Sequence, residues 1–107
     1  MTNEYGEELD SNGYAPSIVE IYGGDCCYWC KRGGQLVRHE VFHGSNRRKS
    51  KELGLWVHLC PSCHMRLHGQ DAQIDRSLKI IGQQRAEAYY GWKVQQFRKI
   101  FGKNYSN

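Results

Sequence analysis

The sequence predicts a small α+β domain, in which a β-hairpin and a short helix are joined by cysteines and followed by C-terminal α-helices. Three observations support this fold class. Two Cys-x-x-Cys pairs enclose two short apolar runs that are rich in β-branched and aromatic residues. From Ala72 onward, apolar residues recur at the three- and four-residue steps of an amphipathic helix. The chain has 107 residues, which suits a single domain with a modest core.

The composition is that of a globular protein. Hydrophobic residues make up 39% of the chain and charged residues 24%. No apolar run is long enough to span a bilayer, and the N-terminus is acidic rather than a secretory signal. We therefore expect a cytoplasmic protein without a membrane partner. In such a reducing compartment, Cys-x-x-Cys pairs bind metal rather than form disulfides.

The predicted domain has three segments. Residues 1–25 form an irregular, acidic N-terminal segment, residues 26–70 a metal-bound core, and residues 71–107 a helical segment. Within the first segment, Ile18 to Tyr22 is a short apolar run that predicts a strand or one helical turn, and Gly23-Gly24 ends it.

The core segment predicts two antiparallel strands and a helix. Leu36–Phe42 and Leu53–Leu59 have the residue content of strands, and the polar, basic stretch Gly44–Lys51 is predicted as a loop between them. Cys60-Pro-Ser-Cys63 begins a short helix, because a proline in the first turn sacrifices no hydrogen bond. Gly69 can end this helix.

Two further helices are predicted in the last segment. The first runs from Ala72 to a break at Gly91, and the second presents Phe97 and Phe101 on one face before Gly102. We expect both helices to pack on the core. An alternative role for their aromatic residues is a surface for a protein partner.

The four paired cysteines predict a structural Zn²⁺ site. Zinc binds thiolates in a closed tetrahedron, and one Cys-x-x-Cys turn supplies two sulfurs at a suitable separation. The predicted ligands are Cys27, Cys30, Cys60 and Cys63. Cys26 is left without a role, although it could replace Cys27 as a ligand.

Three histidines predict a second metal site with open positions. His64 and His68 are four residues apart, so on a helix they lie on one face and can hold one ion. His64 directly follows a cysteine ligand, which fixes where it points. His39, on the first predicted strand, is the best candidate for a third ligand. The alternative is that His64 and His68 are ordinary surface residues.

The charge distribution points to a polyanionic partner. The net charge is +4, and every charged side chain before Cys26 is acidic, so the basic surplus lies beside the predicted metal ligands. Such a positive field favours nucleic acid, and we expect DNA. The residues expected to contact its backbone are Arg38, Arg47, Arg48, Lys49 and Lys51. A solvated, charged loop is the alternative interpretation of Arg47-Arg48-Lys49.

The stretch from Cys27 to His68 resembles the HNH family of ββα-metal nucleases. The resemblance depends on Cys27-Tyr-Trp-Cys30, on His39, on Cys60-Pro-Ser-Cys63-His64 and on His68. The Asn46-Arg-Arg-Lys-Ser and Gly-Leu-Trp-Val-His-Leu-Cys stretches are similar to those of small phage and prophage HNH-like proteins. The resemblance implies a zinc-stapled treble clef and a location in a bacterial host cell.

The family also implies a mechanism. A histidine of the first strand deprotonates water for attack on a DNA phosphodiester, and a divalent ion such as Mg²⁺ or Mn²⁺ stabilises the leaving oxygen. His39 is then either this base or a metal ligand. If His39 is a ligand, Glu40 takes the place of the base. Strand alternation puts His43 on the same side as His39 and Glu40 on the other side, so His43 is a third candidate.

Two positions depart from the family pattern. Arg38 stands where a further metal ligand is usual, and Gly54-Leu55 stands where the family has an asparagine. Asn46 can take over the loop-bracing role of that asparagine. These departures leave an alternative function, a catalytically degenerate zinc-binding module that binds DNA or a protein partner.

Overall fold

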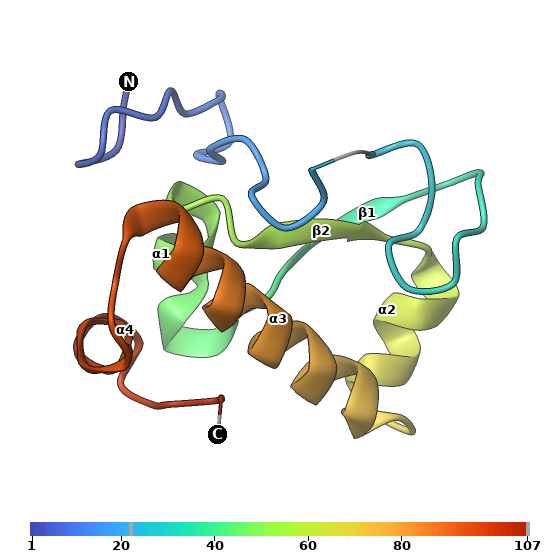
Figure 1. The fold of residues 1–107 in the computed structure, drawn as a ribbon. Helices are drawn as coiled ribbons and strands as arrows, with labels where there is room; N and C mark the ends of the chain where they lie inside the picture. Colours follow the sequence, from blue (N-terminus) through green and yellow to red (C-terminus); the bar gives the residue numbers. More distant parts are fainter. Residues whose placement is uncertain (22, 107) are drawn as a thin grey trace.

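The structure is a computed structural model that describes residues 1–21 and 23–106. A two-stranded antiparallel hairpin lies between the N-terminal segment and the long helix α3 (Ala72–Tyr90) (Figure 1). The predicted α+β class, with a hairpin, helices and a cluster of four cysteines, is confirmed. Within the described residues, no helix is both long and apolar enough to cross a membrane.

The hairpin consists of β1 (Val37–Glu40) and β2 (Trp56–Leu59), with Arg38 opposite His58 and His39 opposite Val57. Because neighbouring side chains of a strand point to opposite faces, this register divides the hairpin into two surfaces. His39 and Val57 share one face, and Arg38 and His58 share the other.

The antiparallel pairing was predicted, but both strands are shorter than expected. Beyond Glu40, the Phe42 N–H donates to the hydroxyl of Ser50 at 3.1 Å, and that hydroxyl donates to the Leu55 carbonyl. The next rung is only half formed, because the Val41 N–H donates to the Leu55 carbonyl at 3.0 Å, whereas the Leu55 N–H donates to the Ser50 carbonyl at 2.8 Å. The hairpin opens at this point because the buried Ser50 supplies partners, from its backbone and its side chain, that a strand would otherwise supply.

The prediction of a loop over Gly44–Lys51 is wrong. This stretch forms a 3₁₀ turn, η1 (Gly44–Asn46), and a helix, α1 (Arg47–Glu52). Arginine, lysine and glutamate are good helix formers, and Arg48 forms an i,i+4 ion pair with Glu52 at 2.8 Å. The high charge of the stretch marks an exposed helix surface rather than a loop.

Helix α2 (Pro61–Leu67) begins where it was predicted. Cys60 is the N-cap residue, and its sulfur accepts the Cys63 N–H at 3.4 Å. The helix ends at Leu67, two residues before Gly69, and His68 adopts helical dihedral angles at the C-cap.

Both C-terminal helices match their predictions. Helix α3 stops at Gly91 and helix α4 (Val94–Phe101) at Gly102, each glycine with a left-handed backbone of φ 70° and 83° respectively. Helix α3 packs closely on the end of β1, since a Cβ at Gly82 would lie 2.9 Å from the Val41 side chain. The predicted packing of these helices on the core is therefore observed.

The N-terminal segment crosses the Arg38–His58 face of the hairpin (Figure 1). The Trp56 indole donates to the Ala15 carbonyl at 2.7 Å, and the Ser17 hydroxyl donates to the Trp56 carbonyl at 2.6 Å. Neither a strand nor a helix forms over residues 18–21; Tyr22, the end of the predicted apolar run, lies outside the described residues. Ile18 and Val19 are buried and contribute to the core instead.

Candidate metal centre

Four thiols converge where three parts of the chain meet: the turn at residues 27–30, here called the knuckle, the end of β2 and the start of α2. The sulfurs of Cys27, Cys30, Cys60 and Cys63 all lie within 4.8 Å of one another. The Cys30 and Cys60 sulfurs are 3.7 Å apart. Cys27, Cys60 and Cys63 are buried. The cysteines are therefore positioned to hold a metal ion, and an all-sulfur set of four is consistent with a structural zinc.

The surroundings of these thiols favour negative charge at two of them. Burial alone would raise the pKa of Cys27, but backbone N–H groups aimed at its sulfur lower that pKa to about 6. The backbone N–H of Cys63 likewise lowers the pKa of Cys60. By contrast, burial and the other thiols raise the pKa of Cys63 to about 12. Four sulfurs this close cannot all ionise without a cation, and a bound dication removes that conflict.

Three imidazoles form a second cluster. One ring nitrogen each from His39, His64 and His68 lies within 4.8 Å of the others. The ring centroids of His64 and His68 are 4.9 Å apart, and that of His39 lies 5.2 Å and 5.7 Å from them. The strand β1, which carries His39, and the helix α2, which carries His64, pack against each other. The three histidines singled out in the sequence are thus brought together in the fold.

His39 is the most unusual member of this cluster. It is 2% exposed, and its Nε2 has no hydrogen-bond partner among the described residues. Burial first, and then the neighbouring imidazoles, His64 first among them, lower its pKa to about 3. A buried polar nitrogen without a partner is costly. A metal ion bound there would accept its lone pair, so the donor set fits a cation.

The cluster is open on the side of His68. His68 is exposed, His64 is partly buried, and burial lowers the pKa of His64. Three imidazoles on one side leave the solvent side for water or for a substrate oxygen. This arrangement differs from the cysteine cluster, where four thiols could complete the coordination of one ion.

His43 lies beside the three histidines and is oriented by an acid. Its ring centroid is 5.8 Å from that of His39 and 5.5 Å from that of His68. Its Nε2 lies 2.9 Å from the Asp75 carboxylate, which also accepts from Lys79 at 2.9 Å. Sequence analysis did not identify Asp75. In the sequence it looks like the acidic half of an ordinary i,i+4 ion pair on α3, 32 residues away from His43.

Glu40 points to the other face of the hairpin. Its carboxylate accepts from the Tyr14 hydroxyl and, at 2.7 Å, from the Arg47 guanidinium. The side chain therefore faces the N-terminal segment rather than the histidine cluster. Strand alternation predicted this direction.

The five basic residues predicted to contact nucleic acid do not lie on one surface. Arg38, Arg47 and Lys51 line a common pocket on the Glu40 side of the hairpin. Arg48 pairs with Glu52, and Lys49 donates to the Ile100 carbonyl at 2.6 Å. Asn46 fastens α1 to the end of α4, because its side-chain amide donates to the Phe101 carbonyl at 3.0 Å.

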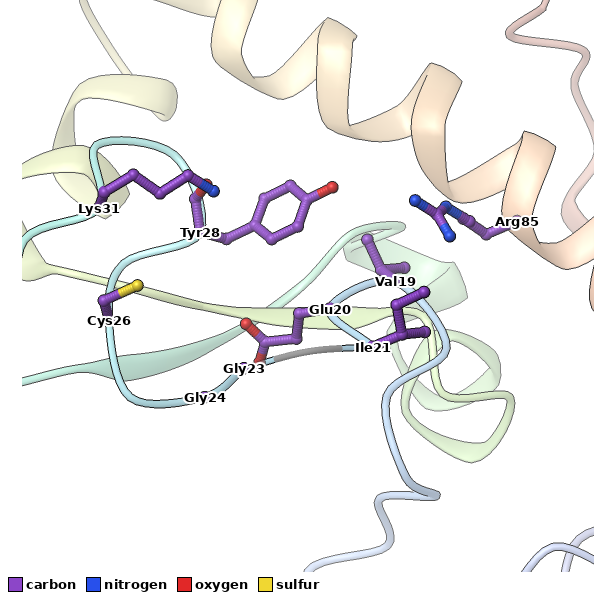
Figure 2. Close-up of a pocket in the computed structure, with 9 residues that line it drawn as sticks. All are labelled: Val19, Glu20, Ile21, Gly23, Gly24, Cys26, Tyr28, Lys31 and Arg85. Atoms are coloured by element: carbon purple, nitrogen blue, oxygen red, sulfur yellow. The ribbon is translucent and has the colours of Figure 1, made fainter.

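Cys26 is separate from the four-sulfur cluster. It lines a cavity of about 230 Å³ between the knuckle and α3, and Tyr28 and Arg85 point into this cavity (Figure 2). In the structure its neighbour Cys27, rather than Cys26, belongs to the cluster. The cavity contains none of the predicted metal-binding histidines.

Comparison of the chain with protein-family models, with curated proteins and with solved structures gives no match.

Proposed function

We propose that this protein is a metal-dependent, HNH-like endonuclease with a treble-clef, ββα-metal core, which hydrolyses DNA phosphodiester bonds with a histidine-activated water. The observation that carries the proposal is the pair of unlike clusters. One has four thiols and suits a closed, structural site, and the other has three imidazoles and leaves positions open. In this proposal, Zn²⁺ at Cys27, Cys30, Cys60 and Cys63 staples the hairpin to α2.

The open site would be formed by His39, His64 and His68. A divalent ion bound there supplies Lewis-acid stabilisation of the charge that develops on the phosphate and its leaving oxygen. The donor chemistry bears on which ion is suitable. Imidazole suits Zn²⁺, Ni²⁺ and similar transition ions, whereas Mg²⁺ prefers oxygen ligands. We therefore expect the histidine cluster to bind Mg²⁺ more weakly than the transition ions Zn²⁺ and Ni²⁺, and to bind Mn²⁺ with intermediate affinity.

We assign the general base to His43. The Asp75 carboxylate holds the Nε2 side of the ring as a hydrogen-bond acceptor, which favours the tautomer with a lone pair on Nδ1. That lone pair can accept a proton from water near the cluster. His39 then acts as a ligand, and Glu40 is occupied by Tyr14 and Arg47 on the other face.

The test is cleavage of supercoiled plasmid by protein that carries metal at the cysteines, with each divalent ion added in turn. We expect nicking with at least one transition ion and loss of nicking in His68→Ala, because this exposed ligand can be removed without opening the core. His58→Gln is the matched control, since His58 lies outside the cluster and pairs with Glu20. Absence of nicking with every ion, in folded protein that binds a second ion, would refute the proposal.

A second candidate function is a non-catalytic module that binds DNA through its basic residues. Arg38 occupies the position where the family usually has a further metal ligand, and it forms an ion pair with Asp10 at 2.8 Å. The absence of a ligand side chain at this position favours the non-catalytic function. This function predicts salt-sensitive DNA binding that survives both His39→Ala and His68→Ala. Loss of all DNA binding in His39→Ala would count against it.

A further inference from the structure

A cationic pocket lies on the face of the hairpin opposite the histidines. Its volume is about 450 Å³, and its lining residues are Asn12, Tyr14, Arg38, Arg47 and Lys51. These residues come from the N-terminal segment, β1 and α1, which are separate in the sequence and come together here. A pocket with three cations among five lining residues is an unusual place for like charges to gather.

The N-terminal wall of this pocket is built around one carboxylate. Asp10 accepts the backbone N–H groups of Asn12 and Tyr14, at 2.9 Å and 3.0 Å, and also the Arg38 guanidinium at 2.8 Å. These bonds set the turn that places Asn12 and the Tyr14 ring beside β1. The acidic N-terminal segment thus forms one wall of the cationic pocket and leaves its cations accessible.

The cations on the other wall are arranged at an energetic cost. Arg47 and Lys51 are four residues apart on α1, a spacing at which like charges destabilise a helix. The Arg47 Nε–H donates to the Glu40 carboxylate, and one terminal nitrogen of Arg38 pairs with the Asp10 carboxylate. Lys51 has no carboxylate within ion-pair distance among residues 1–21 and 23–106, and its ammonium lies 4.8 Å from the Tyr14 ring centroid. Three cations against two carboxylates leave one positive charge in excess, with free guanidinium and ammonium N–H groups.

We propose that this pocket binds a phosphate group. A phosphate presents several acceptor oxygens in a tetrahedron, which match the remaining N–H donors of two guanidinium groups, an ammonium and the Asn12 amide. The Arg47 side chain is 62% exposed, so the pocket admits a group that belongs to a long polymer. We assign the phosphate to the backbone of the DNA strand, and this assignment rests on the proposed function. The proposal that the pocket binds a phosphate group does not depend on that function.

The first arm of the test uses inorganic phosphate, titrated at constant ionic strength against chloride. We expect saturable NMR shifts at the Arg47 Nε–H and the Asn12 side-chain amide. Lys51→Gln should abolish most of the shift and keep the fold, because the Lys51 side chain makes no ion pair in the described structure. Arg98→Gln removes the same charge from an exposed position of α4 and should leave the shift intact.

The second arm measures the anisotropy of a labelled duplex at several salt concentrations with no divalent ion added. Lys51→Gln should weaken binding several-fold and reduce the slope of log K against log salt by about 0.9, the value for one phosphate contact, and Arg98→Gln should not. Since no cleavage is measured, an inactive histidine site does not affect the result.

The two arms separate the possible outcomes. Phosphate shifts together with a changed DNA slope support the whole proposal. Phosphate shifts with an unchanged DNA slope would keep the pocket but overturn its assignment to the DNA backbone. Absence of saturable shifts, with equal DNA binding by Lys51→Gln and Arg98→Gln, would overturn the pocket altogether.

Discussion

At the residue scale, His39 shows how burial keeps an imidazole free of protons. A histidine that is 2% exposed and has a pKa of about 3 stays neutral over the physiological range. Its lone pair is therefore available to a cation without competition from protons. The same burial should lower the stability of the fold in acid, because His39 can take up a proton in the unfolded chain but not in the folded one.

The first prediction concerns the pH dependence of stability. The pKa of His39 falls from its ordinary value of 6.5 to about 3 on folding. Between these values the unfolded state binds the additional proton, so the free energy of unfolding should decrease as pH falls below 6.5. The expected slope is up to about 1.4 kcal/mol per pH unit for one proton.

This slope can be measured by urea unfolding of protein that carries metal at the cysteines only. His39→Gln should show a shallower dependence between pH 6.5 and 5, because glutamine does not titrate. Loss of the thiolate-bound metal in acid affects both proteins equally and cancels in the difference. Identical slopes would show that His39 is not shielded from protons.

The second prediction separates positioning from metal binding. Asp75→Asn should lower the rate of plasmid nicking about 10-fold or more, because asparagine no longer fixes the tautomer of His43. The affinity of the histidine cluster for the added ion should stay the same, since the hydrogen bonds and ion pairs of the Asp75 side chain in the described structure go to His43 and Lys79 and to none of the three ligands. A parallel fall in metal affinity would place Asp75 in the metal site instead.

At the element scale, the turn between α1 and β2 is fixed by the N-terminal segment. Gly54 has a left-handed backbone at φ 75°, and a Cβ there would collide with the Pro16 carbonyl oxygen. The Gly54 carbonyl also accepts the Ile18 N–H at 2.9 Å. The close approach of these two backbones explains why a glycine stands where the resemblance to HNH proteins would place an asparagine.

The third prediction tests this close approach. Gly54→Ala should reduce the free energy of unfolding by more than about 2 kcal/mol, because strain at positive φ adds to overpacking. Gly91→Ala is the control, with φ 70° and nothing within 4 Å of its Cβ, so it reports the backbone strain alone. Equal losses in the two variants would mean that the N-terminal segment yields to the added methyl group.

At the scale of the whole molecule, the cysteine and histidine clusters lie close to one hairpin but differ in their donor atoms and in their exposure. The cysteine cluster joins the knuckle, the end of β2 and α2. Two of its members, Cys27 and Cys63, are themselves part of the hydrophobic core. The histidine cluster lies at the open side of the same junction. The fold should therefore depend on the first ion and not on the second.

The fourth prediction follows from this difference. A weak chelator should remove any ion from the histidine cluster and leave the circular dichroism spectrum unchanged. A strong chelator that removes the metal from the cysteines should unfold the chain, since structural zinc contributes on the order of 10 kcal/mol in small domains. Metal analysis and circular dichroism of the same samples check both steps. A native spectrum in fully metal-free protein would contradict the stapling role.

Much of the local structure was predictable from neighbouring residues. Cys60-Pro61 predicts the start of α2, and Gly91 and Gly102 predict the ends of α3 and α4. Hydrophobic periodicity identified the two C-terminal helices. The helix α1 was missed because its charged sequence has no apolar stripe, and only the buried Ser50 side chain shows which face it packs.

The sequence by itself determined the donor chemistry: two cysteine pairs at metal-binding spacing and two histidines one helical turn apart. Only the tertiary structure decided that His43 meets Asp75, that the partner of Glu40 is Tyr14, and that the acidic N-terminus forms one wall of a cationic pocket. The physical reason is range. Spacing along a strand or helix is set by local backbone geometry, whereas these contacts join residues 26 to 32 positions apart and depend on how the whole chain packs.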